Sequence, residues 1–258
     1  MGNTNMQSKF IALLGGAALT LGLVNVASAA DMAARPYVKA APMIEAMYNW
    51  GGFYIGANGG YASSRKCWDF AGTVAVPLAV NSPEGCHDAT GGVIGGQIGY
   101  NWQAGAWVFG LEAQGDWADL SGSNASISPF GVGFTNRSRI DAMGLFTGRV
   151  GYAWNNALLY VKGGAAVVND KYNYFVTATG ANVGTASETR WGATVGAGLE
   201  YGFTPNWSVG VEYNHIFLDA RNIAFASPAR TVDRIHQDVD MVTARINYRF
   251  GGPVVARY

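Results

Sequence analysis

The sequence is poor in charged residues. Only 13% of its 258 residues are Asp, Glu, Lys or Arg, about half the share found in an ordinary soluble protein. The 17 basic and 17 acidic residues cancel, whereas a nucleic-acid-binding protein carries a basic excess, so no nucleic-acid partner is predicted. A soluble protein with so few charges would also tend to associate at neutral pH. The composition favours a chain that presents apolar surface to something other than water.

Long apolar runs are missing beyond the N-terminal region. No later window offers about 18 consecutive apolar residues, so no transmembrane helix is predicted. The one apolar run, residues 10–26, follows Lys9 and ends before the small-x-small motif Ala27-Ser28-Ala29. This order predicts a secretory signal peptide over residues 1–29 rather than a membrane anchor. Residues 30–47 have two prolines and no periodicity, and we expect them to form an N-terminal periplasmic linker.

Cysteine is nearly absent. Cys67 and Cys86 are the only two cysteines. Because export leads to an oxidising compartment, the pair is predicted to form a disulfide. Closing a loop of this size would contribute about 3 kcal/mol in the chain-entropy model. The alternative, a redox or metal-binding pair, has only His87 as a neighbouring ligand.

The mature chain shows alternation instead of long runs. From Trp107 to Trp117, apolar and polar residues alternate with the period of two that is typical of a β-strand. The same pattern recurs over residues 93–102, 191–201, 207–213 and 240–250, and less regularly over 51–61, 140–154 and 158–167. These segments make about eight strands, each near the 9–11 residues that a tilted transmembrane strand needs.

The connections between these segments alternate in length. Three are short, at residues 103–106, 155–157 and 204–206, and four are long, at about 62–90, 118–139, 168–189 and 215–238. Tyr and Trp gather at both ends of the segments, as two membrane interfaces would require. We therefore predict an all-β fold: an eight-stranded antiparallel up-and-down transmembrane β-barrel with four long outer loops. It would occupy residues 48–250, with a C-terminal tail at 251–258. The alternative is a soluble barrel with its apolar face turned inward.

The face opposite the aromatic residues carries charge. Its mid-strand members are predicted to form a charge network in the lumen: Glu112, Arg149, Lys162, Glu200, Glu212 and Arg245. Asp116 and Arg249 share that face. Side chains just fill the interior of an eight-stranded barrel, and buried charges must pair, so the network is interpreted as a structural plug. The alternative, a narrow small-solute or ion pore, stays open at this point.

Three histidines fall in or beside the predicted long loops, at His87, His215 and His236. With a nearby acid and a loop serine, such a residue could build a lipid-modifying enzyme at the barrel rim. Almost any set of loops contains these residue types, so we interpret the histidines as solvated. The sequence predicts no catalytic, cofactor-binding or metal-binding residue, and no enzymatic activity.

Several short motifs occur in a recognisable order. They are Trp50-Gly51-Gly52-Phe53-Tyr54-Ile55-Gly56, the strand end 95–103 (GGQIGYNWQ), Gly148-Arg149-Val150-Gly151-Tyr152, Gly198-Leu199-Glu200-Tyr201 and Asn247-Tyr248-Arg249-Phe250. Their order resembles the outer-membrane immunogenic (surface-antigen) β-barrel family of alpha-proteobacteria, related to the OmpA-like small barrels.

The resemblance implies a protein of the Gram-negative bacterial outer membrane with a structural or surface-presenting role and no cofactor. The expected partners are outer-membrane lipid, the barrel-assembly machinery, and extracellular or host surface ligands contacted by the loops. Members of this family usually end in the last Phe of the barrel, which implies Phe250 as the assembly signal. Here the chain continues past that residue to Tyr258.

Overall fold

The computed structural model describes residues 48–226 and 230–251. The predicted signal peptide (1–29), the linker (30–47) and all but the first residue of the predicted tail lie outside the described residues. In the described part no helix is long and apolar enough to cross a membrane.

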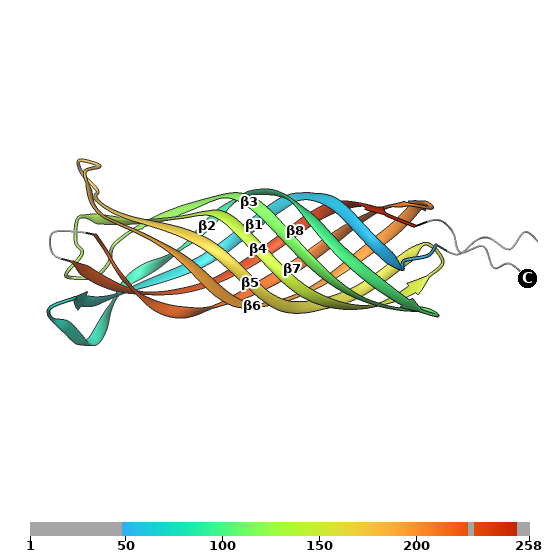
Figure 1. Cartoon of the computed structure of the whole chain (residues 1–258). Helices are drawn as coiled ribbons and strands as arrows, with labels where there is room; N and C mark the ends of the chain where they lie inside the picture. The colour runs from blue at the N-terminus through green and yellow to red at the C-terminus, as the bar shows by residue number, and fades with distance from the viewer. Residues whose placement is uncertain (1–47, 227–229, 252–258) are drawn as a thin grey trace, which may run out of the picture. The chain divides into compact units, whose positions relative to one another are not determined.

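The described chain forms eight strands, and each pairs antiparallel with the next. Their bounds are β1 Gly52–Thr73, β2 Pro77–Ala104, β3 Trp107–Ala125, β4 Phe134–Trp154, β5 Ala157–Val176, β6 Asn182–Thr204, β7 Trp207–Ala224 and β8 Thr231–Arg249. Pairing of β1 with β8, from Tyr54↔Arg249 to Thr73↔Thr231, closes the barrel (Figure 1). The predicted eight-stranded antiparallel barrel is confirmed.

Three tight turns join strands at one end of the barrel. They lie at residues 105–106, 155–156 and 205–206, where the sequence predicted short connections. Two of them place a residue in the left-handed region, Gly105 at φ 62° and Asn155 at φ 51°, as the tight turns of β-hairpins require. The first and last described strands also end here, at the right of Figure 1.

The prediction of four long outer loops is wrong. The segments assigned to loops are mostly strand, and the outer connections are short, at residues 74–76, 126–133, 177–181 and 225–230. The strands run for 18 to 28 residues. Only part of each strand is therefore needed to cross the membrane, and the rest extends the barrel beyond it.

The extension was missed because its alternation is inverted. In the extension, charged residues such as Arg65 and Lys171 point outward, while Trp68, Tyr172 and Ile235 point inward and are fully buried. This is the pattern of a water-soluble barrel, opposite to that of the membrane-crossing part. Register shifts in β4 and β7 also change which residues face inward, so a strict period of two does not continue.

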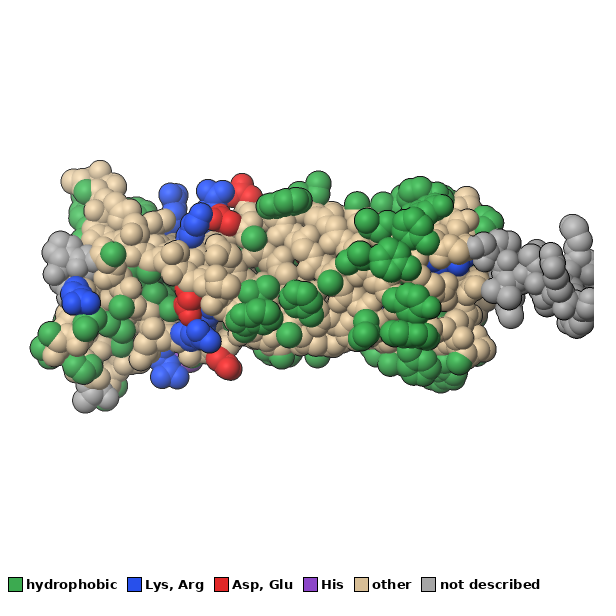
Figure 2. Space-filling view, in the orientation of Figure 1, with side chains coloured by type: hydrophobic (Ala, Val, Ile, Leu, Met, Phe, Trp, Pro, Cys, Tyr) green, Lys and Arg blue, Asp and Glu red, His purple; other side chains and the backbone are tan. Residues whose placement is uncertain are grey.

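Figure 2 shows that the outward surface of the barrel has two parts. Apolar side chains cover the part near the tight turns, and a belt of acidic and basic side chains follows on the outer part. Ion pairs tie this belt together, among them Arg139 with Asp141 at 2.7 Å and Arg221 with Glu188 at 3.1 Å. Outward-facing, paired charges are typical of a surface that is exposed to water.

Two rings of exposed aromatic residues bound the apolar band. The inner ring, near the tight turns, includes Trp102, Trp107 and Trp207, and the outer ring includes Trp117 and Trp191. Trp107 and Trp117 lie on one strand, about 33 Å apart along it at about 3.3 Å per residue. A tilt of about 40° reduces this to about 25 Å, the height of the apolar band of outer-membrane barrels.

Inside, the barrel is layered. Tyr48, Trp50 and Leu158 belong to an apolar cluster at the inner end, and polar side chains fill the level above it. The largest apolar cluster follows and includes Leu120, Ile140, Leu145, Ile216 and Met241, each fully buried. A third apolar cluster, built around Trp68 and Tyr172, fills the extension.

Candidate functional site

Six charged side chains from six successive strands meet in the lumen, between the inner apolar cluster and the large one. They are Glu112 (β3), Arg149 (β4), Lys162 (β5), Glu200 (β6), Glu212 (β7) and Arg245 (β8). Their side chains are at most 2% exposed. Three cations and three anions leave this lumen network with no formal net charge. The structure thus brings together all six residues named from the sequence.

Each charge in the lumen network contacts more than one opposite charge. Lys162 Nζ bonds Glu112 at 2.9 Å and Glu212 at 2.7 Å. Arg149 bonds Glu200 at 3.0 Å, and Arg245 forms close ion pairs with both Glu112 and Glu212. Because every anion is shared by at least two cations, loss of one residue would unbalance several contacts.

Neutral neighbours complete the hydrogen bonding of the network. The hydroxyls of Tyr54 and Tyr160 each donate to a carboxylate at 2.6 Å, to Glu112 and Glu212 respectively. Glu200 accepts hydrogen bonds from Ser208 and Asn247, both at 3.1 Å. Buried carboxylates need such donors, because leaving an oxygen unsatisfied costs about 1–3 kcal/mol.

Glycines on adjacent strands leave room for these long side chains. Gly99 is the cross-strand partner of Glu112, Gly110 that of Arg149, and Gly198 that of Glu212. A Cβ on Gly198 would lie 2.4 Å from the Tyr160 ring, and one on Gly99 2.3 Å from the Tyr54 hydroxyl. The high glycine content of the strands is therefore partly a consequence of the charged lumen.

Two other inward charges do not join the network. Asp116 accepts a hydrogen bond from Gln114 at 2.9 Å and has one oxygen without a partner. Arg249 lies at the inner end, where it donates to the backbone carbonyls of Gly51 at 3.2 Å and Pro205 at 2.7 Å. It ties the end of β8 to the beginning of the barrel.

A second buried polar group, which the sequence reasoning missed, lies in the extension. Lys66 (β1) pairs with Asp170 (β5) at 2.5 Å, with both side chains fully buried. Gln237 donates to Asp170 at 3.2 Å and accepts a hydrogen bond from Arg190. Burial lowers the pKa of Lys66, and the Asp170 carboxylate opposes that shift. Lys66, Asp170 and Gln237 fell in segments assigned to loops, so their inward direction could not be inferred.

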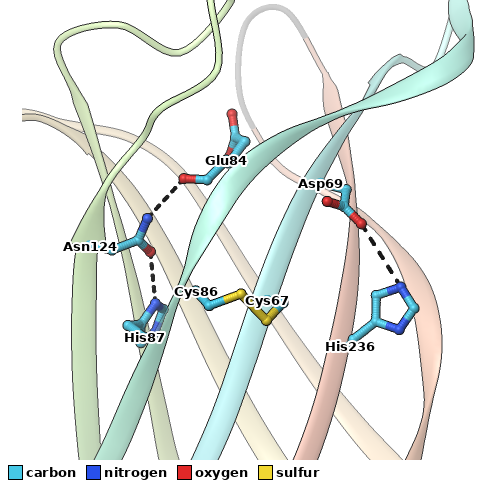
Figure 3. Close-up of a disulfide and its surroundings, with 7 residues drawn as sticks. All are labelled: Cys67, Asp69, Glu84, Cys86, His87, Asn124 and His236. Carbon is cyan, nitrogen blue, oxygen red and sulfur yellow. Dashed lines mark hydrogen bonds and ion pairs between the residues drawn. A yellow bond between two sulfur atoms is a disulfide. The ribbon is translucent and has the colours of Figure 1, made fainter.

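Cys67 and Cys86 are directly opposed on β1 and β2 (Figure 3). Their sulfur atoms are joined, and their Cα atoms lie 4.1 Å apart. The pair lies on the outward side of the extension, because the flanking Lys66 and Trp68 are buried inside. The bond links two strands that already pair in register.

The interpretation of the three histidines as solvated loop residues is wrong about the loops, because His87, His215 and His236 lie on β2, β7 and β8. It is also wrong about solvation for His87. The Nδ1 atom of His87 bonds Asn124 Oδ1 at 2.7 Å, and its Nε2 bonds Ser138 Oγ at 3.1 Å. Asn124 Nδ2 donates to a backbone carbonyl (Figure 3), so its Oδ1 accepts from His87 and leaves Nε2 to accept from Ser138. Burial lowers the pKa of His87, which favours this neutral form.

The chain from Ser138 through His87 to Asn124 has the order of a hydrolytic triad. However, Ser138 is fully buried, and a nucleophile must be reached by its substrate. His215 and His236 point outward and contact Asp240 at 2.7 Å and Asp69 at 3.9 Å. No group of three or more His, Cys, Asp or Glu residues suited to a metal ion occurs at positions 48–226 and 230–251.

Phe250 follows the last strand at the inner end of the barrel. Its side chain is 50% exposed and contacts the rings of Phe53 and Tyr248, with ring centroids 5.6 and 5.0 Å away. Its backbone N–H donates to the carbonyl of Phe53 at 2.8 Å. It thus stands at the closing edge between β1 and β8.

Comparison with known proteins agrees with this architecture. The model of the outer membrane protein beta-barrel domain matches residues 16–250. The chain is 30% identical over 208 residues to the 31 kDa outer-membrane immunogenic protein of Brucella melitensis, covering 79% of this chain and 85% of that protein. It is 31% identical over 172 residues to the 22 kDa outer membrane protein of Rhizobium leguminosarum, covering 65% and 64%. Among solved structures, the Escherichia coli outer membrane protease OmpT superposes with a TM-score of 0.52 at 12% identity, covering 77% of this chain and 97% of that one, a likeness of fold alone.

Proposed function

This chain belongs to the outer membrane β-barrel family and resides in the bacterial outer membrane, and on that premise we propose that it is a sealed barrel with a structural and surface-presenting role, neither a pore nor an enzyme. The membrane-crossing part anchors it. The extension holds the outer connections above the lipid.

One observation carries this proposal: the lumen is closed at two successive levels. The lumen network fills the first level with side chains that are at most 2% exposed. Above it, fully buried apolar residues such as Leu120, Ile140 and Met241 fill the cross-section. An ion would have to pass a neutralised charge cluster and then an apolar layer, where it would lose its hydration.

Three kinds of partner follow from the surfaces. Outer-membrane lipid would cover the apolar band between the two aromatic rings. The barrel-assembly machinery would recognise the C-terminal edge, where Phe250 is half exposed and pairs with β1 through its backbone. Extracellular ligands would meet the charged belt and the four outer connections.

A planar bilayer measurement tests the sealed lumen. Purified, refolded protein should give no stable single-channel current. Arg149→Ala, which opens the first level but leaves the apolar layer in place, should also remain silent. A large and steady current from the wild-type protein would instead favour the small-solute or ion pore.

A further inference from the structure

Large apolar side chains are exposed at the outermost end of the barrel, beyond the charged belt (Figure 2). Among the described residues they are Val74, Val76, Val80, Ile127, Phe130 and Val132, which together form what we call the apolar tip. Their exposed fractions run from 50% for Val74 to 82% for Val80, comparable with the 60% of the lipid-facing Leu111. The end of the barrel that lies farthest from the membrane therefore exposes apolar side chains as freely as the membrane-crossing part does.

The apolar tip is one surface, because the connections that carry it are bonded to each other. The backbone N–H of Ile127 donates to the carbonyl of Glu84 at 3.1 Å, which joins the β3–β4 connection to β2. The ring of Phe130 lies 5.5 Å from that of Phe70 on β1. A contiguous apolar patch of this kind is typical of an interaction site. Because its connections are already fixed, little conformational entropy is lost when a partner binds.

The membrane that holds the barrel cannot reach the apolar tip. The outer aromatic ring lies at Trp117, and β3 continues from there to Ala125 before the connection with Ile127 and Phe130 begins. This stretch of strand is about 26 Å long at about 3.3 Å per residue, or about 20 Å along the barrel axis at a tilt of about 40°. A partner that covers the apolar tip must therefore come from outside that membrane.

The charge beside the apolar tip favours a lipid surface as that partner. In the sequence, the four outer connections contain no Asp or Glu, and Arg230 is their one charged residue. Arg230 is exposed, and its carbonyl accepts a hydrogen bond from the N–H of Val74 at 3.0 Å, so it lies next to the tip. It forms no ion pair with a carboxylate among residues 48–226 and 230–251. Apolar side chains that enter a membrane interface, together with a basic residue and no acidic one, suit an anionic lipid surface.

We propose that the apolar tip docks onto a second lipid bilayer, one that contains anionic phospholipid and faces the outer membrane. The proposal rests on the surface-presenting role proposed above and names the kind of surface that is met. The apolar side chains would enter the interface of the second bilayer to a depth of about 5–10 Å, and Arg230 would pair with lipid phosphate. The charged belt would stay in the water between the two membranes.

Flotation of nanodisc-held barrels with lipid vesicles tests the proposal. The refolded full chain is placed in nanodiscs of phosphatidylcholine, which cover the apolar band and leave the apolar tip free. The vesicles consist of phosphatidylcholine alone or of phosphatidylcholine mixed with phosphatidylglycerol, and empty nanodiscs give the background. The loaded nanodiscs should float with the mixed vesicles. They should bind the neutral vesicles about fivefold more weakly, since one basic residue near an anionic surface contributes that much.

Matched variants separate the apolar contribution from the charged one. Val80→Ser and Val132→Ser should each weaken binding to both kinds of vesicle about tenfold, because an apolar side chain no longer leaves water. Val80→Ile and Val132→Ile keep that side chain apolar and should bind like wild type. Arg230→Gln should weaken binding about fivefold on the mixed vesicles alone. Its control is Arg65→Gln, which removes an exposed cation from the charged belt and should have no effect.

Gels of unheated and heated samples show whether each variant has folded. If a serine variant fails to fold, Val132→Trp decides instead, because a larger apolar side chain should tighten binding. The proposal is overturned if wild-type nanodiscs float with the mixed vesicles no better than empty ones. It is equally overturned if the serine variants or Val132→Trp bind like wild type. Association of loaded nanodiscs with each other that Val132→Ser abolishes would also overturn it, because the apolar tip would then join two copies of this chain.

Failure of this proposal can be told apart from failure of the proposed function. Absence of flotation together with a silent bilayer recording refutes the lipid contact alone. A steady current from barrels that do float with vesicles refutes the sealed lumen and leaves the lipid contact in place.

Discussion

Replacing Arg245 with Met would perturb the lumen network at a residue that pairs with all three of its carboxylates. The guanidinium of Arg245 forms close ion pairs with Glu112 and Glu212 and lies 3.8 Å from Glu200. Its removal changes the formal charge of the network from zero to −1, and the three carboxylates keep only two cations. The Met side chain occupies much of the same space, so the change is mainly electrostatic.

The expected loss of unfolding free energy is about 3–5 kcal/mol, the usual cost of breaking a buried ion pair by removing one partner. Adding Glu112→Gln restores neutrality. We expect a coupling of about 1–3 kcal/mol between the two substitutions, because residues in one ion-pair network are not additive. Arg149→Ala and Glu200→Ala should each lower the stability in the same way, since they contact each other at 3.0 Å.

Urea unfolding in lipid vesicles, followed by tryptophan fluorescence and by unheated against heated gels, measures these differences. Val195→Leu provides the control, because Val195 is 50% exposed on the lipid-facing side and should change stability by less than about 0.5 kcal/mol. The reasoning is refuted if Arg245→Met leaves the urea midpoint unchanged while a bilayer current appears. In that case the charges would be a gate in a wet lumen.

Three further predictions concern separate parts of the barrel. Mass spectrometry of unreduced peptides from outer-membrane protein should recover Cys67 and Cys86 as one linked pair, and two free thiols would contradict this. Gly198→Ala should lower the urea midpoint, since its Cβ would lie 2.4 Å from a tyrosine ring and overpacking costs about 1–3 kcal/mol; Gly115→Ala, with nothing within 4 Å, should be nearly neutral. Burial raises the pKa of Asp233 to about 8, above its value in the unfolded chain. The free energy of unfolding should therefore fall as the pH rises toward that value, by up to about 1.4 kcal/mol per pH unit. Asp233→Asn should flatten this slope, and an unchanged slope in the variant would contradict the assignment to Asp233.

The membrane-crossing part of the fold could be predicted from sequence because the lipid imposes a rule on each residue. Between Trp107 and Trp117 every second side chain must be apolar, and the tight turns fix where each strand ends. The same rule assigned Arg149 and Glu200 to the lumen, since neither could face hydrocarbon. In this part of the barrel, the residue types alone were sufficient to predict which side chains face the lipid and which face the lumen.

The extension could not be predicted in this way, because water surrounds it and the apolar side chains turn inward. Trp68 and Ile235 lie inside, whereas Arg65 lies outside. This alternation is the reverse of the one that identified the membrane-crossing strands. The register shift between Ile140 and Ala142 breaks the period again. Without the strand assignment, Lys66 could not be placed in the lumen either.

The pairing within the lumen network also lay beyond sequence reasoning. On β5 the residue directly opposite Arg149 is Lys162, a like charge, yet the ion-pair partner of Arg149 at 3.0 Å is Glu200, two strands away. Which charges meet depends on strand tilt, on the space left by glycines and on how far each side chain reaches. None of these is encoded in the period of a single strand.

The long strands have a consequence for how this protein can be recognised on an intact cell. At its outer end the connections between strands are short, at residues 74–76, 126–133, 177–181 and 225–230. Most of the protruding surface is sheet, on which side chains from neighbouring strands lie next to one another although they are far apart in sequence. Antibodies or phages that bind it would therefore recognise discontinuous epitopes that boiling destroys. Short synthetic peptides would reproduce little of that surface, and vaccine or diagnostic reagents would need the folded barrel.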